Sequence, residues 1–179
     1  MKIKGLSLIN FALVIADFLK KNNIDVVLSG GSCVSMYVDN PYESKDLDFV
    51  LYVSEERKNV DELLQSIGFF REGRYLRHKD TEFFLDFLLP PPSIGEEPIR
   101  IPAVIKRGKR CLKLLSPTDC IKDRLAAYYY WDDRQCLEQA ILVGLKHPVD
   151  LSEIERWSNA EGMSAKFKVF LKRVKVQKK

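Results

Sequence analysis

The chain has 179 residues and a net charge of +4, with 46% hydrophobic and 30% charged residues. This composition is typical of a soluble globular protein and excludes disordered and fibrous classes, and the length suits one domain or one domain with a helical extension. No segment reaches the ~20 consecutive apolar residues that a membrane span needs. The apolar N-terminal segment is interrupted by Asn10, Asp17 and Lys20, which argues against a signal peptide.

The chain has four cysteines, Cys33, Cys111, Cys120 and Cys136. They form no Cys-x-x-Cys pair and have no clustered histidine partners. A zinc site is therefore not expected. Scattered thiols in a lysine-rich chain are typical of a reducing compartment, so we expect a cytoplasmic protein without a membrane partner.

The first part of the chain alternates helical and extended patterns. Apolar residues at helical spacing predict an amphipathic helix over residues 6–21. A short β-branched run at 25–28 predicts a strand, and residues 32–37 predict one or two helical turns. Residues 45–53 predict a second strand, in which acidic and apolar side chains alternate between the two faces.

The middle of the chain continues this mixed pattern. Residues 54–68 predict a helix with acidic residues in its first turn, and residues 69–78 predict a strand or a hairpin. A strongly apolar strand is expected at 82–89, a stiff exposed loop at 90–95, and one or two further strands at 99–115.

The character of the sequence changes near residue 115. Ser116-Pro-Thr-Asp119 is a helix start, with serine as N-cap and proline at the first helical position. The pattern is helical from there to about residue 173. We therefore predict an α+β fold with a mixed sheet and flanking helices over 1–115, followed by a helical subdomain over 116–179.

Three aspartates are the candidate metal ligands. Asp46 and Asp48 lie two residues apart on one strand face, which separates them by about 6.6 Å. Asp86 stands within an apolar run, and a buried carboxylate needs a cation or several donors. Carboxylates placed in this way suit magnesium beside a phosphate. Two alternatives remain open, namely an exposed strand for the first pair and a structural salt bridge from Asp86 to Arg77 or Arg100.

A glycine turn between the first strand and the following helix is the candidate phosphate site. Gly30 and Gly31 let the backbone approach a ligand, and the helix N-terminus offers free N–H groups and a partial positive charge. Ser29 and Ser32 add hydroxyl groups. Tight packing alone also explains many such turns. The chain lacks both the P-loop and the dinucleotide-binding glycine patterns.

Ser-Gly-Gly-Ser at 29–32, Asp46-Leu-Asp48 and a lone Asp86 on a later strand together resemble the nucleotidyltransferase superfamily of DNA polymerase beta type. Within it, the chain is similar to the minimal nucleotidyltransferases and to the abortive-infection toxin–antitoxin group. The resemblance extends to the helix that begins at Ser116, where Lys122 matches a lysine that faces the nucleotide in that group. Cys136 and Gln139 stand where an acidic pattern is common in the family.

The resemblance implies a magnesium-dependent transfer of a nucleoside monophosphate from a nucleoside triphosphate to an unknown acceptor, with release of pyrophosphate. The three aspartates would be catalytic and would hold two Mg²⁺ ions, for which Mn²⁺ could substitute, while the turn and Lys122 would bind the nucleotide, ATP included. RNA, tRNA, a protein hydroxyl or a small molecule could accept the group. The alternative is a catalytically degenerate module of the same fold, such as a toxin–antitoxin component.

A weaker interpretation is RNA binding through two features of the C-terminal part. The last fourteen residues are lysine-rich without an acid, and the cluster Tyr128-Tyr-Tyr-Trp131 contains rings that could stack on bases. A solvated terminal helix and ordinary core packing explain the same features.

Overall fold

The computed structural model describes residues 2–38, 44–53 and 56–177, with the side chains of 56–58 excepted. The elements of the first half are α1 (Leu8–Lys21), β1 (Val26–Ser29), α2 (Gly30–Tyr37), β2 (Asp46–Leu51), α3 (Glu56–Gln65), β3 (Phe69–Glu72), β4 (Tyr75–His78) and β5 (Phe84–Leu88). The remaining elements are β6 (Ser93–Ile94), β7 (Glu97–Pro98), β8 (Ala103–Arg107), β9 (Arg110–Leu114), α4 (Pro117–Trp131), α5 (Arg134–Lys146), α6 (Leu151–Ala160) and α7 (Ser164–Gln177). The expected helix start at Ser54 and the terminal Lys178 and Lys179 lie outside the described residues.

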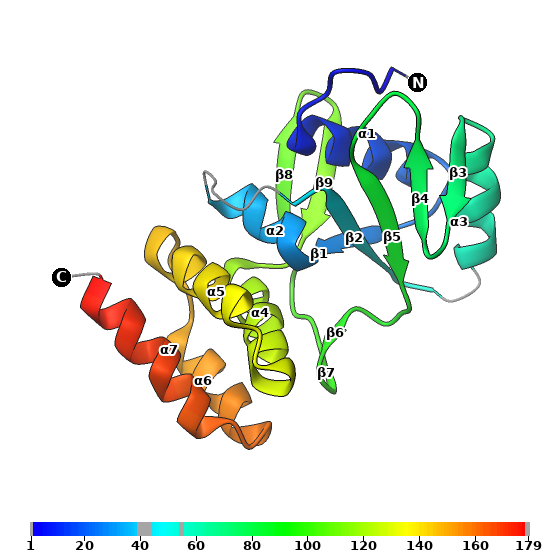
Figure 1. Ribbon diagram of the computed structural model, residues 1–179. Coiled ribbons are helices and arrows are strands. Elements are labelled where there is room, and N and C mark those ends of the chain that lie inside the picture. Colours follow the sequence, from blue (N-terminus) through cyan, green and yellow to red (C-terminus); the bar gives the residue numbers. More distant parts are fainter. Residues whose placement is uncertain (1, 39–43, 54–55, 178–179) are drawn as a thin grey trace.

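Seven strands form one mixed sheet in the order β3-β4-β5-β2-β1-β9-β8 (Figure 1). The central strands β2 and β5 are parallel, and β1 is antiparallel to β2. The sequence prediction of a mixed sheet with flanking helices is confirmed. The expected strand or hairpin at 69–78 is a hairpin, and residues 103–114 contribute two strands.

Alternation along β2 separates a core face from a polar face. Leu47, Phe49 and Leu51 are fully buried and belong to the hydrophobic core, which also contains Phe11 of α1. Asp46 and Asp48 point to the other face, because successive strand residues point to opposite sides of a sheet. The polar face is the one that α2 approaches, and Gly30 lies directly against Asp48.

The expectation of an exposed loop at 90–95 is wrong in part. Ser93–Ile94 pairs with Glu97–Pro98 as a small two-stranded hairpin, separate from the main sheet. Ile94 is only 5% exposed because this hairpin packs against α4. A buried isoleucine within a proline-rich segment gave no periodic signal from which a strand could be predicted.

The C-terminal helices gather on one side of the sheet, and α2 contacts both α4 and α5 (Figure 1). The N-cap prediction is confirmed, since Ser116 Oγ accepts the Asp119 backbone N–H at 3.1 Å. Asp133 and Asp150 cap α5 and α6 in the same way. A division of the chain at residue 115 remains a prediction. Among the described residues, no helix combines the length and apolar character that a membrane crossing requires.

An ionic cluster joins the β6–β7 hairpin to α4 and α6. Glu153 is buried, and its carboxylate accepts hydrogen bonds from Arg156 at 2.8 Å, Arg100 at 3.0 Å and Lys122 at 3.2 Å. Arg156 also donates to Glu97 at 2.6 Å. Hydrogen bonds from Arg156 and Lys122 together with their charges outweigh burial and lower the pKa of Glu153 to about 2. The cluster therefore stabilises the fold only while Glu153 is ionised.

We expect this cluster to make stability depend on acid pH. A carboxyl whose pKa is lowered on folding stabilises the protein above its unfolded pKa of 4.5 and loses that effect as the pH falls toward about 2. Between pH 6 and pH 3 this loss amounts to about 2 kcal/mol. Glu153→Gln should remove that share of the pH dependence in urea unfolding. Glu155→Gln, which changes an exposed carboxyl on the same helix, should leave the pH dependence intact. Equal pH dependence in all three proteins would contradict the assignment.

Candidate active site

The three predicted aspartates meet on one face of the sheet because β2 and β5 are parallel neighbours. The register pairs Asp48 directly with Asp86, and Asp46 lies two residues earlier along β2. Adjacent strands are about 4.8 Å apart, so the two paired carboxylates are close neighbours. The expected convergence of the three acids is thus present in the fold.

The electrostatics of Asp48 show the effect of this convergence. Its pKa is raised to about 7, first by burial and then by the negative charges of Asp46 and Asp86. The positive charge of Arg124 acts in the opposite direction. Three carboxylates in mutual repulsion form a site that gains from a bound cation.

Gly30 is the residue that lets the backbone turn come so close to these acids. Its φ is +68°, and a Cβ at this position would lie 2.9 Å from Asp48 Cγ and closer still to Oδ2. Only glycine combines this backbone conformation with the absence of a side chain. The glycine turn therefore forms one wall of the carboxylate site, as the sequence predicted.

The two serines of the turn serve the backbone rather than a free surface. Ser29 Oγ donates to the Asp48 carbonyl at 3.2 Å, and Ser32 Oγ donates to the Ser29 carbonyl at 3.2 Å. Their hydroxyl protons are thus used within the turn. The donors left for a phosphate are the backbone N–H groups of the first turn of α2, which has no side-chain cap.

The sequence did not predict the residues that contact Asp46 and Asp86. Ser44 donates its hydroxyl to Asp46 Oδ1. Arg74, at the turn between β3 and β4, places Nε 3.0 Å from Asp86 Oδ2. The expected structural partners of Asp86 were Arg77 and Arg100, and neither is its partner, because Arg77 pairs with Glu72 and Arg100 with Glu153. The hairpin register decides which arginine reaches Asp86.

Lys122 does not contact any of the other predicted site residues. It is only 3% exposed, and its ammonium group lies 3.2 Å from Glu153 and 3.5 Å from Glu97. The α4 cation that acts on Asp48 is Arg124, which donates to Asp123 at 2.7 Å and to Cys136 Sγ at 3.5 Å. A nucleotide contact by Lys122 remains a prediction that no contact in the structure supports. Sequence spacing could not distinguish two cations two residues apart.

The donor chemistry of the site fits a divalent metal ion. Mg²⁺ prefers carboxylate and phosphate oxygens, and the three aspartates supply such ligands beside a turn that suits phosphate. Among the described residues, no three His, Cys, Asp or Glu side chains already adopt a metal-binding arrangement. An ion at Asp86 would take the place of the Arg74 guanidinium.

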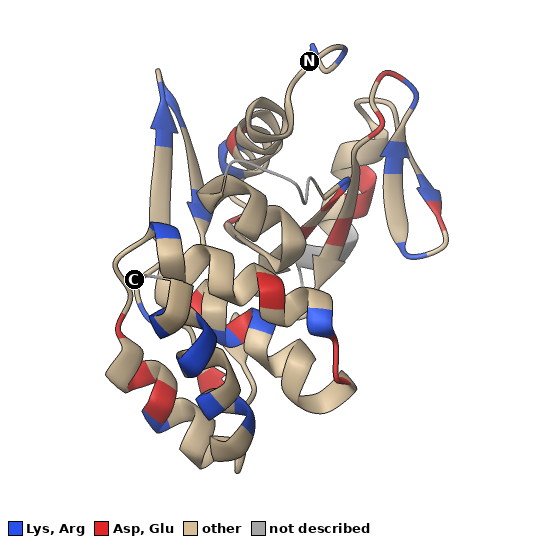
Figure 2. Cartoon of the chain, turned by 60° about the vertical axis from the view of Figure 1, so that its left-hand side comes forward, with Lys and Arg blue, Asp and Glu red and all other residues tan. Residues whose placement is uncertain are grey.

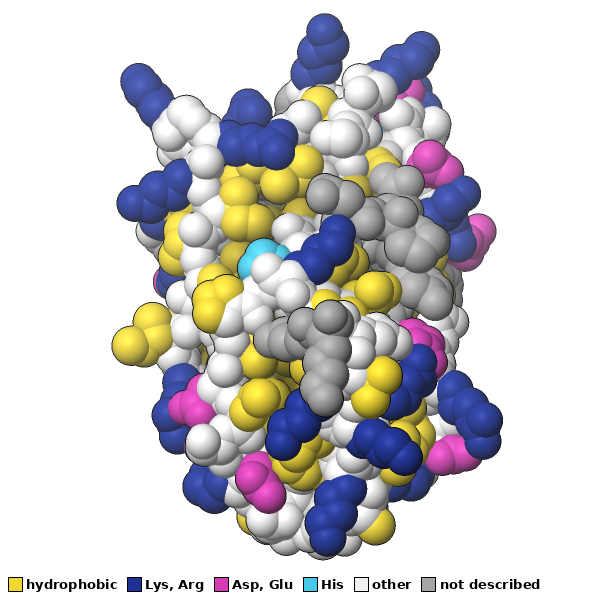
Figure 3. All heavy atoms as spheres, turned by 90° about the vertical axis from the view of Figure 1, so that its left-hand side faces the viewer, with side chains coloured by type: hydrophobic (Ala, Val, Ile, Leu, Met, Phe, Trp, Pro, Cys, Tyr) yellow, Lys and Arg dark blue, Asp and Glu magenta, His cyan; other side chains and the backbone are white. Residues whose placement is uncertain are grey.

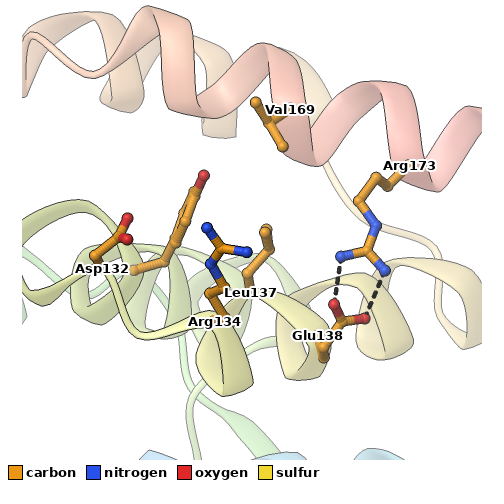
Figure 4. Close-up of a pocket in the computed structure, with 7 residues that line it drawn as sticks. Asp132, Arg134, Leu137, Glu138, Val169 and Arg173 are labelled. Atoms are coloured by element: carbon orange, nitrogen blue, oxygen red, sulfur yellow. Dashed lines mark hydrogen bonds and ion pairs between the residues drawn. The ribbon is translucent and has the colours of Figure 1, made fainter.

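The aromatic cluster at the end of α4 divides into buried and exposed rings. Tyr128 and Tyr129 are less than 10% exposed, whereas Tyr130 is 51% and Trp131 77% exposed. Tyr128 lines a pocket of about 280 Å³ between α5 and α7, which the Arg173–Glu138 ion pair bounds on one side (Figure 4). None of the predicted site residues lines this pocket.

The basic C-terminal region does not form a uniform positive surface. Lysines and arginines are intermixed with acidic residues over the C-terminal helices (Figure 2). On the face shown in Figure 3, the Lys and Arg side chains are separated by hydrophobic and acidic ones. Lys166 of α7 also pairs with Asp132 at 3.1 Å. These contacts favour ordinary helix packing over the RNA-binding interpretation.

Solved structures share this architecture. A crystal structure of an antigenic nucleotidyltransferase-like protein from Paracoccidioides brasiliensis matches with a TM-score of 0.61, at 17% identity, over 80% of this chain and 78% of that chain. The chain therefore has a nucleotidyltransferase-like fold, which confirms the resemblance at the level of the fold. The solution structure of the antibiotic-resistance factor ANT(2″)-Ia matches with a TM-score of 0.51, at 15% identity, over 95% of this chain and 94% of that chain. No protein-family model matches the sequence, and a search of curated proteins finds no match.

Proposed function

We propose that the protein is a Mg²⁺-dependent nucleotidyltransferase that moves a nucleoside monophosphate from a nucleoside triphosphate to an acceptor hydroxyl. The observation that carries the proposal is the register of β2 and β5. It places Asp48 beside Asp86 on the face that the glycine turn of α2 approaches. Burial and the charges of Asp46 and Asp86 raise the pKa of Asp48 beside a turn that admits no side chain, and perturbed carboxyls of this kind are typical of functional sites.

The residues of the chain have distinct roles in this proposal. Asp46, Asp48 and Asp86 hold the metal ions, and the N–H groups of the first turn of α2 bind the terminal phosphates. Arg124 adds positive charge near Asp48. When bound, Mg²⁺ or Mn²⁺ would supply charge neutralisation at the triphosphate and at the acceptor oxygen.

The transfer itself is a displacement at phosphorus. The acceptor oxygen forms a bond to the α-phosphate, and its proton passes to a carboxylate oxygen of Asp86. The bond between the α-phosphorus and the bridging oxygen breaks, and pyrophosphate leaves with the electron pair. RNA, tRNA, a protein hydroxyl or a small molecule could supply the acceptor. The name of ANT(2″)-Ia as an antibiotic-resistance factor makes small molecules a class to test early.

The test is a transfer assay with the full chain. The protein is incubated with Mg²⁺ or Mn²⁺ and each α-labelled nucleoside triphosphate, with cell RNA, cell protein and a small-molecule pool as acceptors. We expect metal-dependent label on one acceptor class and release of pyrophosphate. If the protein neither binds a nucleoside triphosphate nor gains stability from the metal, the proposal fails.

A second candidate is a binding or regulatory module of the same fold, such as a toxin–antitoxin component. The contact between Arg74 and Asp86 favours it, because a guanidinium occupies one of the metal-ligand positions. Absence of both nucleoside triphosphate binding and metal binding would support this alternative.

Replacement of Arg74 tests whether Asp86 can serve as a metal ligand. In Arg74→Ala, Asp86 loses its guanidinium partner, so a metal ion no longer competes with it. We expect Mg²⁺ or Mn²⁺ to raise the unfolding temperature by more in the variant than in the wild type. The metal-free variant should lose stability, because the buried Asp86 carboxyl is left without its cationic partner. Arg77→Ala on the same hairpin is the control. An equal or smaller metal effect in Arg74→Ala would show that Asp86 is not a ligand.

A further inference from the structure

Gln139 of α5 is a buried amide whose carbonyl oxygen is unpaired. The residue is 5% exposed, and its Oε1 has no hydrogen-bond partner among the described residues. An apolar side chain of the same size would fill this position without leaving a buried carbonyl oxygen unpaired. Packing alone therefore does not account for a glutamine here.

The other end of the same amide faces the glycine turn. Gln139 Nε2 lies 3.9 Å from the position that a Cβ on Gly31 would take, and Ser44 Oγ lies 3.2 Å from that position. Ser44 in turn donates to Asp46. The amide thus stands between the first turn of α2 and the first of the metal-binding aspartates.

The neighbouring residues bring a positive charge to this corner of the site, although Arg124 also pairs with Asp123 at 2.7 Å and Cys136 Sγ donates to Asp133 at 3.3 Å. Cys136 lies one turn before Gln139 on α5, so both residues face the same side of the helix. The Arg124 guanidinium donates to Cys136 Sγ at 3.5 Å. A neutral donor beside an arginine and a helix N-terminus suits an anionic ligand with several oxygens.

We infer that Gln139 is a binding residue for the β,γ-diphosphate of the nucleoside triphosphate, with Nε2 as a donor to the phosphate that rests on the first turn of α2. The inference rests on the proposed function and deepens it, because it names a residue of α5 that contacts the leaving group. The same contact then holds pyrophosphate after transfer.

Inorganic pyrophosphate with Mg²⁺ is the probe, and calorimetric titration of the full chain is the measurement. We expect Gln139→Leu to weaken pyrophosphate binding about 10-fold, because a donor is lost. Gln139→Glu should weaken it more, on the order of 100-fold, because a carboxylate then faces the phosphate. The matched control is Gln135→Leu, an exposed glutamine on the same helix.

Thermal unfolding provides the readout that a structural role would not share. Gln139→Leu should unfold at the same temperature as the wild type or higher, since the variant removes an unpaired buried oxygen. Loss of stability together with unchanged binding would overturn the inference.

Binding of pyrophosphate by Gln139→Glu as tight as by the wild type would also overturn the inference. If the wild type itself binds neither pyrophosphate nor a nucleoside triphosphate, both the inference and the proposed function fall. Normal binding by Gln139→Leu would overturn the inference alone.

Discussion

Asp48→Asn should reduce nucleotidyl transfer by on the order of 10³-fold or more while making the metal-free protein more stable. Asp48 stands between Asp46 and Asp86, and its raised pKa reflects burial and the charges of both neighbours. An amide keeps the shape of the side chain and removes one of the repelling charges, so the fold gains. The same change removes a metal ligand, so the charge that develops on the phosphate during transfer loses its counter-ion.

The initial rate of pyrophosphate release and the unfolding temperature, each with and without Mg²⁺, check both halves of this prediction. The wild type should gain stability from the metal, and Asp48→Asn should gain much less. Asp80→Asn, which alters an exposed aspartate in the turn between β4 and β5, is the matched control and should behave as the wild type does. Full activity in Asp48→Asn would remove the basis of the proposed function.

Gly30→Ala should abolish transfer and destabilise the fold. A Cβ at Gly30 would lie 2.9 Å from Asp48 Cγ, and the φ of +68° disfavours any side chain. Strain of the backbone accounts for about 1–2 kcal/mol of the expected loss in the free energy of unfolding. The collision with Asp48 adds to this loss, because either the turn or the carboxylate must move.

Gly108→Ala isolates the collision from the backbone effect. Gly108 has a similar φ of +58° in the turn between β8 and β9, and a Cβ there would meet nothing within 4 Å. Urea unfolding of the two variants should therefore show a larger loss for Gly30→Ala, and only Gly30→Ala should lose activity. Equal losses in both would mean that contact with Asp48 contributes nothing.

The polar face of β2 could be predicted because strand periodicity fixes which residues share a face. Asp46 and Asp48 alternate with buried apolar neighbours, and this pattern is visible without any tertiary information. The N-cap of α4 could be predicted for the same reason, since Ser116 and Asp119 lie within one helical turn. Local geometry depends only on residues that are close in the sequence.

The partners of the site could not be predicted in the same way. Arg74 reaches Asp86 because the β3–β4 hairpin pairs with β5 in one particular register. Lys122 and Arg124 lie on one helix, and the packing of α4 against α2 and α6 decides that Arg124 acts on Asp48 while Lys122 pairs with Glu153. Gln139 lies near Gly31 only because α5 packs beside α2, and the spacing of the two residues in the sequence does not reveal this.

The amino-acid sequence alone determined the mixed strand-and-helix order, the glycine turn and the three acids, because each depends on side-chain type and local spacing. Tertiary structure alone decided which charge neutralises which, because ion pairs such as Arg110–Asp17 and Lys113–Asp25 join segments that lie far apart in the sequence. Long-range contacts of this kind are set by strand register and helix packing, and neither can be read from a short stretch of chain.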